Sequence, residues 1–297
     1  MSLFNGLFTG LSAFPITPAD ESGRIDQKGL ESLLARLDAA KVDSIGLLGS
    51  TGTYAYLRRE ERLRAVEIAA KAVKTPLIVG VGALRTDDAI AHARDAATAG
   101  AAGLLLAPVS YTPLTEEEVY RHFVAVAQST GLPLCIYNNP ATTHFSFTPA
   151  LIARLAEIDG IVAVKNPGLP AAEIGASFEA LRTQVPGDFA IGYSADWYAA
   201  DALLAGAAAW YSVVAGLLPE PALRLTRAAQ AGDSSTAKRI DASFGPLWAL
   251  FKEFGSIRVM YAGARILALA EAEPPRPILP MPQEVEGRLR EALAALG

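Results

Sequence analysis

Lys165 is the residue whose type and position point most clearly to chemistry. It ends an apolar run, Ile161 to Val164, whereas the other six lysines lie in helical or polar stretches. An amine that is partly buried at the end of a strand loses hydration that would stabilise its charged form. The neutral amine is the form that attacks a carbonyl carbon to give a Schiff base. Position alone leaves two alternatives open: an ion-paired lysine at the rim of the fold, or one that binds a substrate carboxylate.

Hydroxyl groups suited to proton transfer follow other apolar runs. Tyr137 ends the run 134–137, and its phenol is a candidate to exchange protons with a carbonyl group held near Lys165. Ser50, Thr51 and Tyr111 are candidates for a hydroxyl chain that connects Tyr137 to other groups. The alternative for Tyr137 alone is an aromatic ring that packs under a loop.

The turn Gly49–Thr53, with the sequence GSTGT, presents backbone N–H groups ahead of a helix. Such turns bind carboxylates or phosphates, although glycine-rich turns of this kind are common. Neither a P-loop lysine nor a GxGxxG pattern accompanies it. The three histidines, at positions 92, 122 and 144, are far apart in the sequence, so we expect no metal site.

A regular alternation of elements must position these groups. Eight apolar, strand-like runs occur at 10–15, 44–48, 77–82, 103–107, 134–137, 161–165, 189–192 and 209–213. Amphipathic helical patterns lie at 27–40, 58–74, 86–99, 115–130, 148–158, 170–183, 197–205 and 219–231. Continuous apolar strands are typical of parallel sheets covered on both faces. Eight such units in about 230 residues predict an α/β protein with a (β/α)8 TIM barrel, with an open doubly wound sheet as the alternative.

Catalytic groups of such barrels lie at the carboxyl ends of the strands, where the candidates above all fall. Ser212, at the end of the eighth run, is a further candidate for substrate binding, and Asp196 is expected to cap a helix. Beyond the eighth unit, helical patterns at 235–254, 256–270 and 283–296 and a proline-rich connector predict a C-terminal helical extension. We therefore divide the chain into a barrel, 1–233, and the extension, 234–297.

Composition excludes several classes of function. The 297 residues are 51% hydrophobic and carry 26 basic and 31 acidic residues, a net charge of −5 that argues against nucleic-acid binding. The single cysteine, Cys135, excludes a disulfide framework within one chain and fits a reducing compartment. The uncharged stretch 202–219 contains Gly206 and Gly216, so we interpret it as a turn and a buried strand rather than a membrane span. Without a signal-peptide pattern, a cytoplasmic location is expected.

Several of these motifs together resemble one known family. They are the GSTG segment at 49–52, YNNP at 137–140, a lysine 28 residues after the tyrosine, and the segment 115–123. The sequence is similar, over the whole barrel and the extension, to the dihydrodipicolinate synthase/N-acetylneuraminate lyase family of pyruvate-dependent class I aldolases.

The resemblance implies a role for each matching residue. Lys165 would form an imine with the keto carbon of pyruvate or another 2-oxo acid, without a metal or cofactor. Tyr137 would transfer protons to and from that adduct, Ser50 would relay them, and the backbone around Ser50 and Thr51 would hold the carboxylate. Tyr111 would reach the site of a neighbouring subunit, because the family is typically a homotetramer built from dimers.

The sequence departs from the family pattern on the side of the second substrate. Dihydrodipicolinate synthases carry an arginine where this chain has Thr142, and a threonine cannot form a bidentate contact with a carboxylate. Thr53 replaces a glutamate, and Asn166 to Gly168 differ from better-known members. We therefore expect a Schiff-base lyase, an aldolase or dehydratase, with Thr142 near an unassigned second substrate.

Two alternatives to this function stay open. One is authentic 4-hydroxy-tetrahydrodipicolinate synthase, which condenses pyruvate with aspartate semialdehyde. The other, from a different class, is a 2-oxo acid binder without catalytic activity.

Overall fold

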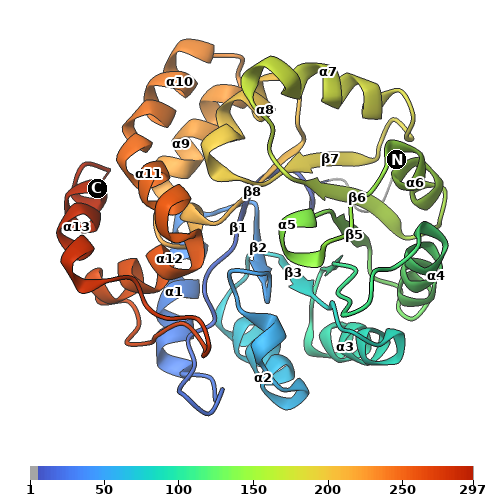
Figure 1. Ribbon diagram of the computed structural model, residues 1–297, viewed down its shortest axis with the longest axis horizontal. Coiled ribbons are helices and arrows are strands. Elements are labelled where there is room, and N and C mark those ends of the chain that lie inside the picture. Colours follow the sequence, from blue (N-terminus) through green and yellow to red (C-terminus); the bar gives the residue numbers. More distant parts are fainter. Residues whose placement is uncertain (1–5, 297) are drawn as a thin grey trace.

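The computed structural model describes residues 6–296 and contains a closed barrel of parallel strands in chain order, with β8 beside β1 (Figure 1). The strands are β1 (Gly10–Ala13), β2 (Ser44–Leu47), β3 (Leu77–Gly80), β4 (Gly103–Leu106), β5 (Leu134–Tyr137), β6 (Ile161–Asn166), β7 (Ala190–Tyr193) and β8 (Ala209–Ser212). The predicted (β/α)8 barrel is confirmed. Several apolar runs extend one or two residues past their strands because residues such as Phe14 and Val81 are buried beyond the last paired position.

A ring of helices surrounds the strands (Figure 1). They are α1 (Gln27–Ala40), α2 (Arg59–Ala72), α3 (Thr86–Ala99), α4 (Glu116–Ala127), α6 (Pro149–Ala156), α7 (Ala171–Arg182), α8 (Ala199–Leu204) and α9 (Pro219–Gln230). Local signals set their ends: Thr115 and Glu118 form a capping box at α4, and Thr148 caps α6 with a proline following it. The short helix α5 (Pro140–Thr143) was not predicted from the sequence.

The C-terminal extension lies to one side of the barrel and is helical, as predicted (Figure 1). It contains α10 (Ser234–Ser243), α11 (Gly245–Phe254), α12 (Ser256–Ile266) and α13 (Glu286–Ala294). The single helix predicted over 235–254 is wrong: α10 ends at Ser243, and Pro246 occupies the first turn of α11. A proline there has no N–H to donate and its ring would clash with the preceding turn. The boundary between 233 and 234 stays a prediction.

The segment 202–219 does not form one continuous helix. It contains the end of α8, strand β8 and the turn η3 (Val214–Gly216), in agreement with the sequence interpretation. None of the helices within residues 6–296 has the length and apolarity needed to cross a membrane.

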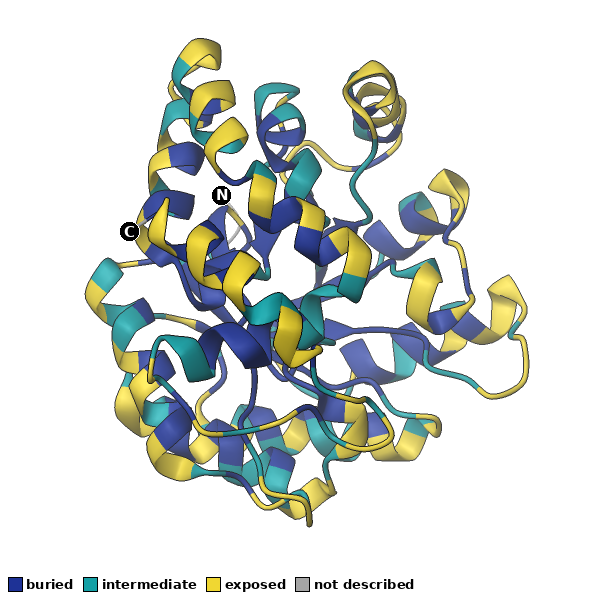
Figure 2. Cartoon of the chain, turned by 60° about the vertical axis from the view of Figure 1, so that its left-hand side comes forward, coloured by how far each residue is buried: buried dark blue, intermediate teal, exposed yellow. Residues whose placement is uncertain are grey.

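Buried residues form two layers, one inside the barrel and one between the strands and the helices. The exposed residues lie mainly on the outer helices and loops (Figure 2). Because side chains alternate along a strand, Ala163 and Cys135 point into the barrel, whereas Trp210 belongs to the outer layer. Phe14 and Tyr211 fill the interior, with ring centroids 6.1 Å apart in an edge-to-face arrangement. These two rings form the floor beneath the strand ends.

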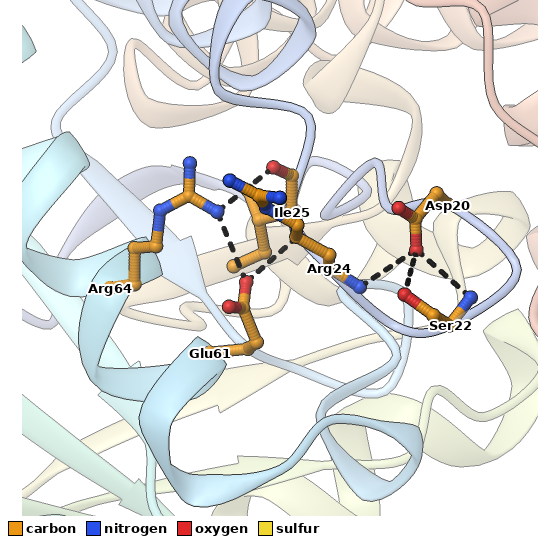
Figure 3. A network of polar contacts seen from close by, with 6 residues as sticks. All are labelled: Asp20, Ser22, Arg24, Ile25, Glu61 and Arg64. Carbon is orange, nitrogen blue, oxygen red and sulfur yellow. Dashed lines mark hydrogen bonds and ion pairs between the residues drawn. The ribbon is translucent and has the colours of Figure 1, made fainter.

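The long loop after β1 is fixed to α2 at the rim of the barrel (Figure 3). Asp20 accepts hydrogen bonds from the backbone N–H groups of Ser22 and Arg24, which closes the turn. Glu61 of α2 accepts from the backbone N–H of Ile25 at 2.8 Å, and Arg64 donates to both Glu61 and the carbonyl of Ile25. The loop also lines a rim cavity of about 380 Å³ that does not include Lys165, so we assign the chemistry to the strand ends instead.

Gly46 of β2 leaves space for the Phe14 ring inside the barrel. A substitution of Gly46 therefore tests how tightly this ring is packed. A Cβ atom at residue 46 would lie 2.2 Å from the Phe14 ring. Because the ring is enclosed, we expect Gly46→Ala to lower the free energy of unfolding by about 1–3 kcal/mol. Gly131→Ala is the matched control, since a Cβ there meets nothing within 4 Å. Urea unfolding of both variants checks the prediction, and equal midpoints would contradict it.

Candidate active site

Lys165 lies inside the barrel near the carboxyl end of β6, with only 3% of its surface exposed. Its Nζ atom lies 4.0 Å from the ring centroid of Phe14, 4.1 Å from that of Tyr137 and 5.9 Å from that of Tyr211. No ion pair among residues 6–296 involves Lys165. The ion-paired alternative raised by the sequence is therefore not found in this part of the chain, and the amine is enclosed by aromatic rings.

Tyr137 is the register partner of Lys165 across β5 and β6, which explains how the two side chains meet. Its hydroxyl lies 3.3 Å from the Ser50 Oγ atom, so the predicted neighbours come together. The side-chain amide of Asn139 donates a hydrogen bond to the Tyr137 oxygen at 2.9 Å. Because that oxygen already accepts from Asn139, the phenol proton is directed elsewhere, toward Ser50 or a bound carbonyl oxygen. The sequence analysis assigned no role to Asn139, although its position two residues after Tyr137 favoured such a contact.

The turn after β2 is held in an unusual backbone conformation. Leu48 and Thr53, which flank it, have φ values of 56° and 52°, a region that costs side-chain-bearing residues on the order of 1–3 kcal/mol. The backbone N–H groups of Ser50 and Thr51 donate to no other residue within 6–296. Thr53 is anchored from below, where its Oγ1 atom lies 3.4 Å from the hydroxyl of Tyr261. The strained turn therefore presents two backbone donors beside Tyr137.

The remaining candidates lie farther from the amine. Thr142 is exposed on α5 and donates its hydroxyl to the Asn139 carbonyl at 3.3 Å, and Tyr111 is 96% exposed. Ser212 is fully buried and has the strand parity of Trp210, which faces the outer layer; its Oγ accepts from the Ala215 N–H. Among residues 6–296, no hydrogen bond joins any of these three residues to Lys165, Tyr137 or Ser50. Their binding and catalytic roles stay predictions.

Asp196 anchors the loop after β8 and does not cap its own helical turn, as had been expected. Its buried carboxylate accepts hydrogen bonds from the Trp210 indole at 2.9 Å and from the backbone N–H groups of Val213 and Val214 at 3.1 and 2.7 Å. Burial raises the pKa of this carboxyl to about 6, although these donors and Lys165 oppose the shift. The carboxylate thus joins the ends of β7 and β8 near the lysine.

The single thiol does not provide a second reactive group. Cys135 is buried below the lysine, where burial raises its pKa to about 12, and its sulfur lies 3.5 Å from the Tyr211 hydroxyl. A thiol that stays protonated is a weak nucleophile. Among residues 6–296, no group of three or more His, Cys, Asp or Glu side chains is placed to hold a metal ion.

The fold and the residues around Lys165 together indicate a class of protein. A (β/α)8 barrel that holds a buried lysine, a tyrosine and two available backbone N–H groups at its carboxyl-terminal rim has the layout of a barrel enzyme. Residues 7–296 match the model of the Dihydrodipicolinate synthetase family. The chain belongs to this family and is a lyase.

Relatives agree with this assignment over nearly the whole chain. A crystal structure of dihydrodipicolinate synthase from Agrobacterium tumefaciens is 61% identical, covers 98% of both chains and superposes with a TM-score of 0.96. Two proteins named 4-hydroxy-tetrahydrodipicolinate synthase are similar as well. The one from Acidiphilium cryptum is 32% identical over 98% of this chain and 99% of its own. The one from Methanothrix thermoacetophila is 31% identical over 99% and 97%.

The raised pKa of Asp196 predicts a specific pH dependence of stability. Because the folded-state pKa of about 6 lies above the usual 3.8, the folded protein binds the proton more tightly than the unfolded chain. The resulting stabilisation is fully present below pH 4 and is lost as the pH rises through 6. Asp196→Asn removes this titration. We therefore expect the stability of the wild type relative to Asp196→Asn to fall between pH 4 and 6.5.

Urea unfolding of both proteins across this range measures the difference. Since all other titrating groups are shared, their effects cancel in the comparison. A difference that is independent of pH, or that rises with pH, would show that the carboxyl is not buried as described.

Proposed function

We propose that the protein is a Schiff-base lyase that binds pyruvate or a related 2-oxo acid through an imine on Lys165. The observation that carries this proposal is the Lys165 amine itself, which is enclosed by three aromatic rings and lies beside Tyr137. Within residues 6–296 it has no carboxylate partner. A purely structural lysine at this depth would normally be paired with an acid. A nucleophilic amine needs the opposite arrangement.

The chemistry follows from the hydrogen bonds of Tyr137. The neutral amine attacks the keto carbon, and the carbonyl π electrons move to oxygen, which takes a proton from the phenol. The nitrogen loses one proton, and the carbinolamine hydroxyl then leaves as water after gaining another. The protonated imine that remains accepts the electron pair when a bond to the adjacent carbon breaks. Ser50, 3.3 Å from the phenol, is placed to return the proton to Tyr137.

The strained turn supports binding of the acid. The backbone N–H groups of Ser50 and Thr51 are available to a carboxylate, and their positions are fixed by the buried side chain of Thr53. A carboxylate held there places the keto carbon toward the barrel axis, where Lys165 lies. The imine supplies the electron sink, so the proposed reaction needs no metal and no cofactor.

Assembly would complete the site. Tyr111 projects into solvent with 96% of its surface exposed. An aromatic side chain exposed to this extent is often covered by a partner protein. We propose a homotetramer, a dimer of dimers, in which Tyr111 reaches the site of a neighbouring subunit.

The second candidate function is 4-hydroxy-tetrahydrodipicolinate synthase, and the names of the similar proteins favour it. It shares the imine with pyruvate and differs in the acceptor, aspartate semialdehyde, whose carboxylate needs a cationic or donor-rich contact. Thr142 is uncharged, and its hydroxyl is already used by the Asn139 carbonyl. The part of the site around Thr142 therefore favours a second substrate without a carboxylate.

Trapping of the imine tests the first half of the reaction. We expect pyruvate with borohydride to add the mass of one reduced pyruvate adduct to the wild type and nothing to Lys165→Ala, because the Lys165 amine is the one placed beside Tyr137 among residues 6–296. Lys252→Ala is the matched control, since Lys252 also lies near aromatic rings, 5.4 Å from that of Trp197, but is exposed on α11. The absence of any adduct with a panel of 2-oxo acids would overturn the proposal, whereas stabilisation without turnover would identify a binder.

The acceptor is tested by turnover with pyruvate and different aldehydes. Because residue 142 offers no charge, we expect aspartate semialdehyde to give kcat/KM lower by about tenfold or more than the best uncharged aldehyde. Coupled assays across such a panel measure the ratio. A preference for aspartate semialdehyde would establish the synthase and show that another group replaces the arginine.

A further inference from the structure

Asn139 connects the buried Tyr137 to the short helix α5. Its side-chain amide donates a hydrogen bond to the Tyr137 oxygen at 2.9 Å. Its backbone carbonyl accepts hydrogen bonds from the N–H groups of Thr142 and Thr143, both at 3.0 Å, and from their hydroxyl groups at 3.3 and 3.0 Å. The backbone of Asn139 is therefore fixed by α5, whereas its side chain contacts Tyr137.

The side chain of Asn139 does not cap the helix that follows it. Asn139 directly precedes the first turn of α5, where asparagine is favoured because its side-chain oxygen accepts from the backbone N–H groups of that turn. The Asn139 side chain makes no such bond at α5. Helix capping therefore does not account for the contact between the amide and Tyr137.

The Asn139 amide favours the deprotonated form of the Tyr137 oxygen. An amide N–H group can only donate, whereas the Ser50 hydroxyl, 3.3 Å from the same oxygen, can donate or accept. A hydrogen bond to an ionised oxygen is about twice as strong as one between neutral groups. Because only 6% of the surface of Tyr137 is exposed, water provides few competing donors. The bond from Asn139 therefore becomes stronger as the phenol gives up its proton.

We propose that Asn139 is a positioning residue that accelerates imine formation, because its amide stabilises the Tyr137 oxygen while the phenol proton is transferred; this inference rests on the proposed function. As the Lys165 amine attacks the keto carbon, the carbonyl π electrons move to oxygen, and that oxygen takes the proton from the phenol. A contact that is stronger in this transition state than before it raises the rate. The final amount of imine is unchanged, since Tyr137 regains its proton. The backbone bonds to α5 hold the donor in place beforehand, so little reorganisation is needed.

The test separates the rate of imine formation from its extent. Samples are taken at intervals after mixing with pyruvate and are reduced with borohydride, and mass spectrometry gives the fraction of protein that carries the adduct. We expect Asn139→Ala to slow adduct formation at saturating pyruvate by about 10-fold to 100-fold, the effect of one lost hydrogen bond to a developing charge. The final yield, and the pyruvate concentration that gives half the maximal rate, should match those of the wild type.

Asn139→Asp distinguishes the donor from the shape of the side chain. Aspartate has nearly the size of asparagine, but its carboxylate only accepts hydrogen bonds and is negatively charged. We expect Asn139→Asp to form the adduct more slowly than Asn139→Ala, because it places a like charge beside the developing negative oxygen. A side chain that only fills space gives the opposite order, with Asn139→Asp close to the wild type, and that order would overturn the proposal.

Ser146→Ala is the matched control, since Ser146 is an exposed polar residue beyond the end of α5 and should leave the rate unchanged. Adduct formation in Asn139→Ala at the wild-type rate would overturn the role of Asn139 and leave the proposed function intact. A slower rate accompanied by a lower final yield and a lower thermal unfolding midpoint would indicate a purely structural role and would also overturn it. We expect that midpoint to stay near the wild-type value, because the Asn139 side chain does not cap α5. The absence of an adduct in the wild type with pyruvate and every other 2-oxo acid overturns the proposed function, and this inference with it.

Discussion

The enclosure of the Lys165 amine by aromatic rings is the interaction on which the rest of the site depends. Removing an ammonium group from water costs several kcal/mol, and faces of aromatic rings return only about 2 kcal/mol of that. A nearby carboxylate would repay more, but the nearest buried acid, Asp196, directs its oxygens to Trp210 and to the backbone of the β8 loop. Within residues 6–296 the Lys165 amine therefore has no carboxylate partner, and the closely packed barrel interior holds it in this unfavourable position.

The interior of the barrel is closely packed because large aromatic rings lie directly against glycines. Phe14 and Tyr211 fit beneath the lysine only because Gly46 and Gly192 lack side chains; a Cβ at either glycine would approach a ring within 2.5 Å. Tyr137 and Lys165 are register partners in β5 and β6, so the pairing of these two strands is enough to place the two side chains next to each other. The placement of Tyr137 beside Lys165 therefore follows from the pairing of β5 and β6 in the closed barrel.

The parts of the fold that could be predicted from the sequence are those set by local patterns of apolar residues. The eight apolar runs and their intervening helices are short-range signals, and parallel pairing in chain order follows from covering both faces of each strand. Lys165 and Tyr137 were identifiable because a polar residue at the end of an apolar strand is unusual. The break between α10 and α11 was missed because the apolar pattern continues through Pro246. The contacts of Phe14 with Lys165 and of Asn139 with Tyr137 were not predicted, since they arise only when separate strand ends meet around the closed barrel.

The side of the site proposed to bind the 2-oxo acid is buried, whereas the side proposed to bind the second substrate is exposed. The 2-oxo acid side consists of buried residues on β5, β6 and the strained turn after β2, with Tyr54 and Arg62 packed behind it. The acceptor side consists of α5, four residues long, with Thr142 exposed and bonded only to its own turn. A substitution on the buried side is expected to disturb the barrel core, whereas one at the exposed Thr142 is not. The proposed imine chemistry therefore depends on the buried side of the barrel, whereas the proposed choice of second substrate depends on α5, where residue 142 departs from the family pattern.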